Sequence, residues 1–460
     1  MVLRANRLGR ISRRRFLASI AIGGAALPSL VPGGVLAAPG KPGANDRVIV
    51  GVIGTGIRGK HLIADLPEEG RVVAVCDSYL PRVADTLAPQ GQYAGPLARF
   101  RERDAERCTA YQDFRKLLDR EKLDAVMIAT PDHNHVLPAM LACQAGLDVY
   151  CEKALSLYVA EGRALVEAAK RHGRVVQVGS QNRSMAMNRL GCRMVREGRF
   201  GKISLIELPN YPGPMRYGGL PEEPVPEGLG WDLFCGQTAL RPHNRKLWVK
   251  DEFKIDDKLW RGWDLWRSYS GHLMTNWGAH SVDIVQLALG TDGTGPVEIW
   301  PLADDYQGEM RFCPLAARYA DGVELRFHLH TDDKWTFHGE HGKLVMGRNK
   351  LATDPPELVT ERPDPALVEP WRVPGKKGPG TVARPHIQNW LDCIKSRARP
   401  NAPVEAGHRS VTICHLAGIA RELRRKLRWD PEQETFPGDK EANSLLSRPR
   451  RKGYELPEIG

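Results

Sequence analysis

The stretch Val48–Gly59, VIVGVIGTGIRG, decides how the first part of this chain folds. An apolar, β-branched run breaks into three spaced glycines, and a helix-compatible segment, Lys60–Leu66, follows. Strand, glycine turn and helix in this order are typical of the phosphate-binding turn of a dinucleotide-binding Rossmann fold. We expect Gly54 to permit the tight turn, Gly56 to let backbone amides approach a pyrophosphate, and Gly59 to let the helix pack closely on the strand.

A second β-branched run, Arg71–Cys76, ends in Asp77, about 20 residues beyond the glycine turn, as the dinucleotide fingerprint requires. A carboxylate at this point binds the adenosine ribose hydroxyls of NAD and repels the 2′-phosphate of NADP. Arg82 is the one nearby residue that favours NADP. The sequence therefore predicts NAD as the cofactor and leaves NADP as the less favoured alternative.

The chain begins with the features of an export signal. Ser12–Leu17, SRRRFL, matches the twin-arginine pattern, an apolar stretch over residues 17–31 follows, and Val35-Leu36-Ala37 offers a small-residue cleavage site. A membrane anchor and a basic tail are the alternatives, but the apolar run is too short and glycine-rich for a good spanning helix. We expect residues 1–37 to be a twin-arginine signal peptide and residues 38–46 to be a linker. The folded protein is then expected to reach the periplasm or another extracytoplasmic space.

The net charge supports this division of the chain. The 460 residues carry a formal charge of +11, but the first 37 hold six arginines and no acid, so the remainder carries only +5. Such a mild charge, interspersed with acids, argues against nucleic-acid binding. Because the twin-arginine route exports folded proteins and nicotinamide nucleotides are scarce outside the cytoplasm, we expect a tightly held cofactor and no membrane contact after signal cleavage.

Alternating strands and helices predict an α/β fold. Over residues 47–180, apolar runs such as Asp124–Ala129 and Gly146–Cys151 alternate with helical patterns, which indicates a doubly wound parallel sheet. Beyond residue 180, strand-like runs joined by short turns favour a mainly antiparallel sheet, residues 352–380 are expected to form a proline-rich loop, and the tail is polar. The sequence predicts a Rossmann domain over 47–180, an α+β domain over 181–430 and a C-terminal arm over 431–460.

Cysteine and histidine spacing predicts no metal site. The nine cysteines form no CxxC pair, so buried free thiols are the favoured interpretation. His133 and His135 form a His-x-His pair, but no third ligand lies nearby in the sequence.

With these motifs assembled, the chain resembles the glucose–fructose oxidoreductase and inositol dehydrogenase (Gfo/Idh/MocA) family, and most closely an exported branch of it. The motifs that carry the resemblance are the glycine turn, Thr130-Pro131 with His135 beyond, Glu152-Lys153, Val178-Gly179, Gly230-Trp231-Asp232-Leu233, Trp277-Gly278-Ala279-His280, Glu441-Ala442-Asn443 and Arg448-Pro449-Arg450. The resemblance implies a large open sheet in the second domain that carries substrate and subunit contacts. It also implies a homo-oligomer, a dimer or tetramer, that acts on sugars, polyols or their derivatives.

Two positions depart from the family pattern. The family usually reads Glu-Lys-Pro where this chain has Glu152-Lys153-Ala154, and the missing proline frees one backbone φ angle. The family commonly has aspartate four residues before its histidine, where this chain has Asn276 before His280. Because asparagine cannot ionise, His280 becomes the favoured base, with its pKa no longer raised by a carboxylate at that position. Asp283 could replace the lost carboxylate, although the polarity of a helix surface explains it equally well.

The resemblance and the strand-end positions together give a candidate site. Lys153 stands where ligands bind in open α/β sheets and could stabilise a developing oxyanion, while histidine titrates in the range useful for a base. We expect Lys153, His280 and Asn276 to be catalytic, and Lys153, Arg183, Asn276 and His280 to contact substrate. The predicted cofactor contacts are Gly54, Thr55, Gly56, Ile57, Arg58, Gly59, Asp77, Thr130, Pro131, Asn134, His135, Glu152, Lys153 and Gln181.

Three functions fit these residues. The first is an NAD-dependent oxidoreductase of a sugar, polyol or sugar derivative, which takes a hydride from a secondary alcohol. The second is an NAD-dependent glycosidase, in which oxidation, elimination, hydration and reduction leave no net redox change, as suits a protein exported without a supply of cofactor. The third is a non-catalytic sugar-binding protein, which the presence of Lys153 and His280 disfavours.

Overall fold

The computed structural model describes Gly43 and residues 46–248, 262–303, 309–329, 334–348, 350–363 and 383–459. The predicted signal peptide and nearly all of the predicted linker lie outside these residues. The helices and strands all belong to the unit that spans Val48–Gly460. Within the ranges described, no helix has both the length and the apolar composition needed to cross a bilayer.

The first apolar runs form a six-stranded sheet in which every strand pair is parallel. The strand order, β3-β2-β1-β4-β5-β6, is that of the Rossmann fold. The sheet contains β1 (Val48–Ile53), β2 (Gly70–Cys76), β3 (Thr109–Tyr111), β4 (Ala125–Ile128), β5 (Asp148–Cys151) and β6 (Val176–Val178). Strands β4, β5 and β6 are buried at every residue, which explains why they read as continuous apolar runs rather than alternating ones.

The strand order reverses between β1 and β4, and this reversal positions the site. In open α/β sheets, ligands bind outside the carboxyl ends of the strands at such a switch point. Gly54 follows β1, Thr130 lies just beyond β4, and Glu152 and Lys153 follow β5. Residues that are about 100 positions apart in sequence therefore meet at one edge of the sheet.

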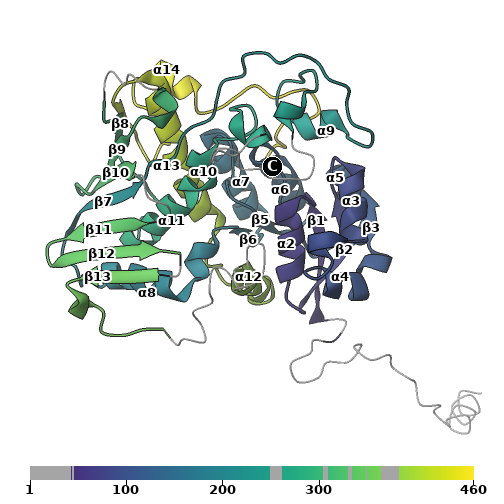
Figure 1. Cartoon of the computed structure of the whole chain (residues 1–460), viewed down its shortest axis with the longest axis horizontal. Helices are drawn as coiled ribbons and strands as arrows, with labels where there is room; N and C mark the ends of the chain where they lie inside the picture. The colour runs from purple at the N-terminus through teal and green to yellow at the C-terminus, as the bar shows by residue number, and fades with distance from the viewer. Residues whose placement is uncertain are drawn as a thin grey trace, which may run out of the picture. The chain divides into compact units, whose positions relative to one another are not determined.

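Helices cover the first sheet, and one of them comes from far along the chain (Figure 1). They are α2 (Ile57–Asp65), α3 (Leu80–Leu87), α4 (Ala98–Arg103), α5 (Phe114–Arg120), α6 (Val136–Gln144), α7 (Val159–Arg171) and α12 (Arg384–Ser396). Ile387, Trp390 and Leu391 of α12 are fully buried in the same apolar cluster as residues of β1 and α2. The range predicted for the second domain, 181–430, thus contains a helix that completes the first.

The second sheet has eight strands, in the order β13-β12-β11-β7-β10-β9-β8-β14. Its strands are β7 (Ile203–Pro209), β8 (Glu298–Pro301), β9 (Leu315–Arg318), β10 (Glu324–Leu329), β11 (Trp335–Gly339), β12 (Gly342–Gly347), β13 (Lys350–Asp354) and β14 (Leu427–Arg428). All pairs are antiparallel except β7 with β10. The predicted fold class, a Rossmann sheet followed by a mainly antiparallel sheet, is therefore confirmed. Strand β13 falls partly in the stretch predicted as loop, because none of its side chains is fully buried and its pattern is weak.

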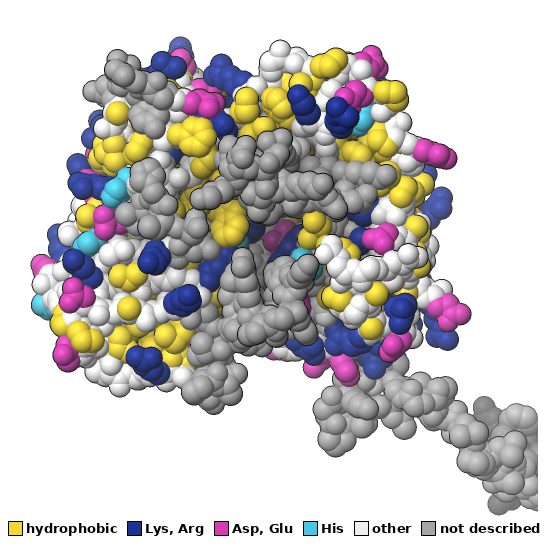
Figure 2. Space-filling view, viewed as in Figure 1, with side chains coloured by type: hydrophobic (Ala, Val, Ile, Leu, Met, Phe, Trp, Pro, Cys, Tyr) yellow, Lys and Arg dark blue, Asp and Glu magenta, His cyan; other side chains and the backbone are white. Residues whose placement is uncertain are grey.

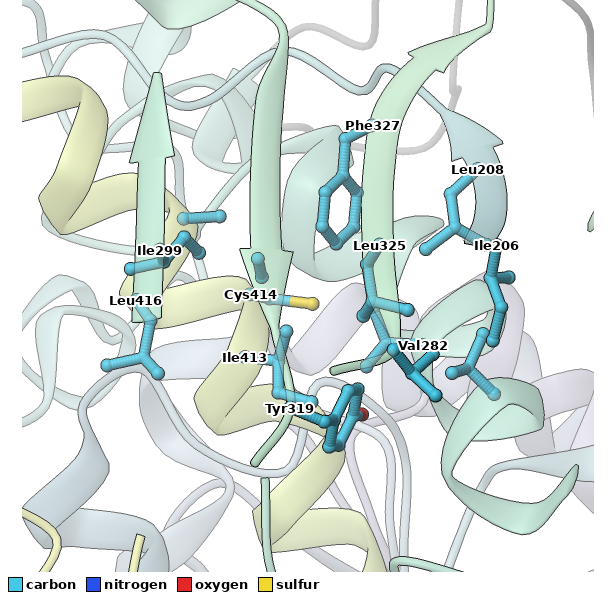
Figure 3. Packing of buried hydrophobic residues seen from close by; sticks show 14 of the residues in the cluster. Ile206, Leu208, Val282, Ile299, Tyr319, Leu325, Phe327, Ile413, Cys414 and Leu416 are labelled. Atoms are coloured by element: carbon cyan, nitrogen blue, oxygen red, sulfur yellow. The ribbon is translucent and has the colours of Figure 1, made fainter. Parts of the chain in front are cut away.

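One face of the second sheet packs on helices. The remaining helices are α8 (Ala186–Arg196), α9 (Trp231–Cys235), α10 (Leu273–Asn276), α11 (Gly278–Leu289), α13 (Val404–Leu423) and α14 (Lys440–Ser444). Figure 3 shows Ile206, Leu325 and Phe327 of the sheet beside Val282 of α11 and Ile413 of α13, all of one buried cluster. This packing fixes α11, which carries His280, against the sheet. The helical stretch around His280 is divided at Trp277 into α10 and α11.

Side chains of both charge signs are interspersed on the face shown in Figure 2. The interior holds the thiols: all nine cysteines are free, and all but the half-buried Cys108 are buried. The prediction of buried free thiols is confirmed.

Candidate active site

The glycine turn leaves a space over the first turn of α2. Gly54 has φ +92°, and a Cβ there would lie 2.6 Å from the backbone of Ala129. A Cβ on Gly59 would overlap the carbonyl oxygen of Gly54, so the helix can approach the strand only with glycine. At Gly56, by contrast, no described atom lies within 4 Å of where a Cβ would stand, and no side chain caps the helix. The backbone around Gly56 thus leaves an open cradle at the start of α2 that suits a pyrophosphate.

Asp77 is fixed at the carboxyl end of β2. Its carboxylate accepts hydrogen bonds from the amide of Thr55 (2.9 Å), the Thr55 hydroxyl (3.3 Å) and the amide of Tyr79 (3.0 Å). Arg82 Nη1 lies 3.2 Å from the same carboxylate. The predicted ribose-binding acid is therefore in place, and Arg82 is paired with it rather than standing apart as a phosphate ligand.

Glu152 joins three strand ends at the switch point. Its Oε1 accepts hydrogen bonds from Arg58 Nε (2.7 Å) and Gln181 Nε2 (3.0 Å), so Arg58 of α2 and Gln181 after β6 meet at the end of β5. Two buried polar atoms in this region, Arg58 Nη2 and Thr130 Oγ1, have no hydrogen-bond partner among the described residues. Buried polar groups are nearly always paired, so these two atoms and the open cradle at Gly56 fit a bound dinucleotide.

The residues after Pro131 brace the site. Both ring nitrogens of His135 lie against carbonyl oxygens, Nδ1 2.6 Å from Ala154 and Nε2 2.8 Å from Thr130. Asn134 Nδ2 donates to the carbonyl of Phe234 at 2.9 Å. These side chains were predicted to contact the cofactor, but the structure uses their polar atoms to tie the Lys153 turn and helix α9 in place.

Lys153, Asn276 and His280 occupy the centre of the site. Lys153 Nζ donates to Asn276 Oδ1 at 2.6 Å, and burial lowers the lysine pKa despite the opposing effect of Glu152. His280 is 7% exposed, and its Nδ1 has no partner among the described residues. Burial, with Arg348 and Lys153 nearby, holds the pKa of His280 well below its ordinary value, so the imidazole is neutral and can accept a proton.

One sequence prediction about a polar residue in this region is wrong, and one possibility that the sequence left open does not hold. Arg183 was expected to touch substrate, but its guanidinium is 1% exposed and pairs with Asp283 (2.8 Å) and Asp292 (2.7 Å). Asp283 was considered as the replacement carboxylate for His280, but it accepts hydrogen bonds from Arg183 and Ser410. A buried guanidinium requires such partners, and both side chains serve this structural ion pair instead.

The structure also brings to the site residues that the sequence did not indicate. Asn276 Nδ2 donates to Asp264 Oδ1 at 3.3 Å, and Asp264 Oδ2 lies 3.0 Å from His272 Nδ1. Ser270 Oγ lies within hydrogen-bond distance of both Asp264 and Asp132. Asp132 could have been found, because it directly follows Thr130-Pro131 at a strand end. Asp264 sits among tryptophans in an aperiodic segment, and no sequence signal marks it.

A parallel Rossmann sheet, a glycine cradle and a lysine at the switch point define a dinucleotide-binding oxidoreductase of the two-domain type. The chain belongs to the Gfo/Idh/MocA oxidoreductase family. The family's NAD-binding Rossmann fold matches residues 48–180, and its C-terminal alpha/beta domain matches residues 216–372 and 376–456. The resemblance inferred from the motifs is confirmed at the level of the family.

Relatives of this chain include both dehydrogenases and a hydrolase. Inositol 2-dehydrogenase 2 of Saccharopolyspora erythraea is 32% identical over 158 residues, 34% of this chain and 43% of the relative. A glycosyl hydrolase family 109 protein of Stenotrophomonas maltophilia is 28% identical over 235 residues, 48% of each chain. The match thus spans less than half the length of each curated relative. The fold is shared with the WlbA dehydrogenase of Bordetella pertussis, crystallised with NADH and UDP-GlcNAcA (TM-score 0.56, 17% identity, 84% of this chain, 99% of that chain).

Proposed function

We propose that this protein is an NAD-dependent oxidoreductase that removes a hydride from a secondary alcohol of a sugar, polyol or sugar derivative. The observation that carries the proposal is the hydrogen-bonded Lys153–Asn276 pair beside neutral His280, at the carboxyl end of β5 in an NAD-binding Rossmann domain. The matched inositol dehydrogenase supports an alcohol-bearing substrate of this class.

The chain's own residues supply the proton chemistry. NAD bound in the Gly56 cradle would supply the hydride acceptor. His280, held neutral by burial, takes the hydroxyl proton of the substrate. The Lys153 ammonium donates to the same substrate oxygen as negative charge develops on it, and Asn276 keeps the ammonium aimed by accepting one of its hydrogens at 2.6 Å.

The proposal includes export by the twin-arginine route, function in the periplasm and a captive cofactor. The arginine pair of Ser12–Leu17 and the apolar stretch after it support export. Assembly into a homo-oligomer is part of the same proposal. The face of the second sheet away from α11 and α13 supports it, because β12 presents half-buried Val345 and β7 half-buried Leu205 there.

The test of this proposal is the nucleotide content of the exported, extensively dialysed full chain. Denaturation should release close to one NAD per chain, and a panel of sugars and polyols should reduce the bound nucleotide, read as NADH fluorescence. The matched control is Gly56→Ala, which should release little nucleotide because its methyl group fills the cradle. A wild-type chain that releases none, or whose bound NAD no alcohol reduces, would overturn the proposal.

A second candidate is an NAD-dependent glycosidase with no net redox change. The matched hydrolase relative and the neutral Asn276 in place of the family's aspartate favour it. Elimination and hydration exchange the C–H beside the oxidised carbon with solvent. Turnover of p-nitrophenyl glycosides in D₂O should therefore give product that carries deuterium on the carbon next to the oxidised one. Unlabelled product would exclude this route.

A further inference from the structure

Two buried carboxyl groups share one hydroxyl beside the catalytic lysine. Ser270 Oγ lies 2.8 Å from Asp132 Oδ2 and 3.1 Å from Asp264 Oδ1, and it also accepts the amide hydrogen of His272 at 3.0 Å. Asp132 is 5% exposed, and Asp264 and Ser270 are fully buried. Asp132 lies after β4, whereas Asp264 and Ser270 lie in the segment before α10, so the contact crosses between distant parts of the chain.

Counting hydrogens shows that this pair holds a proton. A serine hydroxyl has one hydrogen to donate and two lone pairs. The His272 amide occupies one lone pair, and the hydroxyl hydrogen can serve only one of the two carboxyl groups. If both were ionised, the other carboxylate would face an oxygen lone pair at about 3 Å, which is costly in a buried place. One carboxyl group must therefore be neutral and donate to Ser270.

The partners of each carboxyl group show which one keeps the proton. Asp264 has a donor at each oxygen, Asn276 Nδ2 at Oδ1 (3.3 Å) and His272 Nδ1 at Oδ2 (3.0 Å), and so is satisfied as a carboxylate. Among the described residues, the hydrogen-bond partners of Asp132 Oδ2 are the hydroxyls of Ser270 and Thr275. The Thr275 hydroxyl can donate instead to the carbonyl of His272 at 3.3 Å, which leaves Asp132 free to be the donor.

We infer that Asp264 is an ionised positioning residue that holds Asn276 and, through it, Lys153, while Asp132 keeps the one proton that the two acids share. This inference rests on the proposed function, because it assigns a role toward the proposed catalytic lysine. The family commonly has an aspartate at position 276. In this chain a carboxylate instead lies behind Asn276, on Asp264, and contacts the asparagine side chain. Asn276 then presents its oxygen to Lys153 and its amino group to Asp264, an orientation that an acceptor at Asp264 helps to fix.

The surrounding charges agree with this assignment. Burial, followed by repulsion from Asp264, raises the pKa of Asp132 to about 7, against the opposing pull of Lys153. Three other titratable groups lie nearby: His272, whose Nδ1 contacts Asp264, and His133 and His135, which follow Asp132 in the chain. Burial lowers the pKa of His133 and of His135. His272 itself has φ +55°, a strained conformation for a residue with a side chain, and such strain clusters at functional sites.

The first test is an infrared titration of the full chain, whose readout does not depend on turnover. Wild type should show a protonated carboxyl band that titrates near pH 7. Asp132→Asn should lack that band, and Asp264→Asn should shift its titration to lower pH because the repulsion is gone. The control Asp292→Asn removes an acid that is paired with Arg183 and should leave the band and its titration unchanged. A band that survives Asp132→Asn would overturn the shared proton, whatever the substrate proves to be.

The second test separates positioning from structural support. In wild type, ionisation of Asp132 above pH 7 should place a second charge beside Asp264 and lower kcat, whereas Asp132→Asn, whose amide mimics the neutral acid, should show no such decline. Asp264→Asn should lower kcat at least tenfold with the bound NAD retained. The double variant Asp264→Asn/Asn276→Asp, which returns the carboxylate to the helix, should recover most of that loss. Unchanged kcat in Asp264→Asn, or no recovery in the double variant, would overturn the positioning role.

Discussion

A single amide changes the acid–base chemistry of this site. With asparagine at position 276, no carboxylate lies one helical turn before His280, and the imidazole is surrounded by the positive charges of Arg348 and Lys153. Those charges and burial both lower the pKa of His280, so the imidazole is held in its neutral form. The acid that position 276 lacks is present nearby as Asp264, which accepts a hydrogen bond from the Asn276 side chain.

His280→Ala should therefore remove the base without disturbing the cofactor site. We expect kcat to fall by about 10²–10⁴-fold, the usual contribution of a general base, while NAD content stays at the wild-type level. In wild type, the acid limb of the kcat profile should lie below pH 6, because the lowered pKa keeps His280 unprotonated under the ordinary imidazole pKa of about 6.5. Steady-state kinetics between pH 4.5 and 9 check both points.

The control for this prediction is His341→Ala, at an exposed turn between β11 and β12. It should leave the profile unchanged. An acid limb at or above pH 6.5 in wild type, or unchanged turnover in His280→Ala, would assign the base to another group.

At the scale of elements, the turn between β1 and α2 assigns different tasks to its glycines. Gly59 is required by packing, since any Cβ would overlap the Gly54 carbonyl, whereas Gly56 has an ordinary φ of −64° and open space beside it. The same motif thus contains one position that the fold needs and one that a ligand needs.

Alanine at these two positions should separate stability from binding. Compared without bound NAD, Gly56→Ala should unfold at the wild-type temperature. It should bind NAD at least tenfold more weakly, because the methyl group occupies the cradle. Gly59→Ala should lower the stability by about 1–3 kcal/mol, the usual cost of overpacking, or prevent folding. Thermal unfolding and NAD titration check the pair. Equal destabilisation by both substitutions would contradict the division of tasks.

The strong local patterns made most elements predictable. Val48–Gly59 and the apolar runs after it define strands by composition alone, and their alternation with helices predicts a parallel sheet. Strands β13 and β14 were missed because short edge strands bury few side chains. In the site, Lys153 and His280 were predictable from motifs. The contact of Asp264 with Asn276 was not, since it depends on how an aperiodic segment folds over α10.

At the scale of the whole molecule, the end of the chain returns to the first domain. Helix α12 packs on the first sheet, and the C-terminal arm crosses back to α7. Arg448 Nε donates to Glu161 at 2.8 Å, and its Nη1 reaches the carbonyl of Ser268 at 3.2 Å. The arm therefore clamps the segment that carries Ser270 and Asp264 against the Rossmann domain, which residue ranges along the sequence could not show.

Arg448→Ala should both destabilise the protein and lower its kcat. The side chain is 9% exposed and its partner Glu161 is 4% exposed. Its loss leaves a buried carboxylate whose remaining cationic partner among the described residues is Arg450. Breaking a buried pair of this kind costs about 3 kcal/mol, and release of the Ser268 carbonyl should lower kcat as well. Denaturant unfolding and kinetics measure the two effects.

The matched control is Arg425→Ala, whose guanidinium is 41% exposed and pairs with Asp439 at 2.6 Å. Because exposed pairs contribute about 1 kcal/mol or less, that variant should retain nearly full stability and activity, and an equal loss in both variants would show that the arm does not act as a clamp.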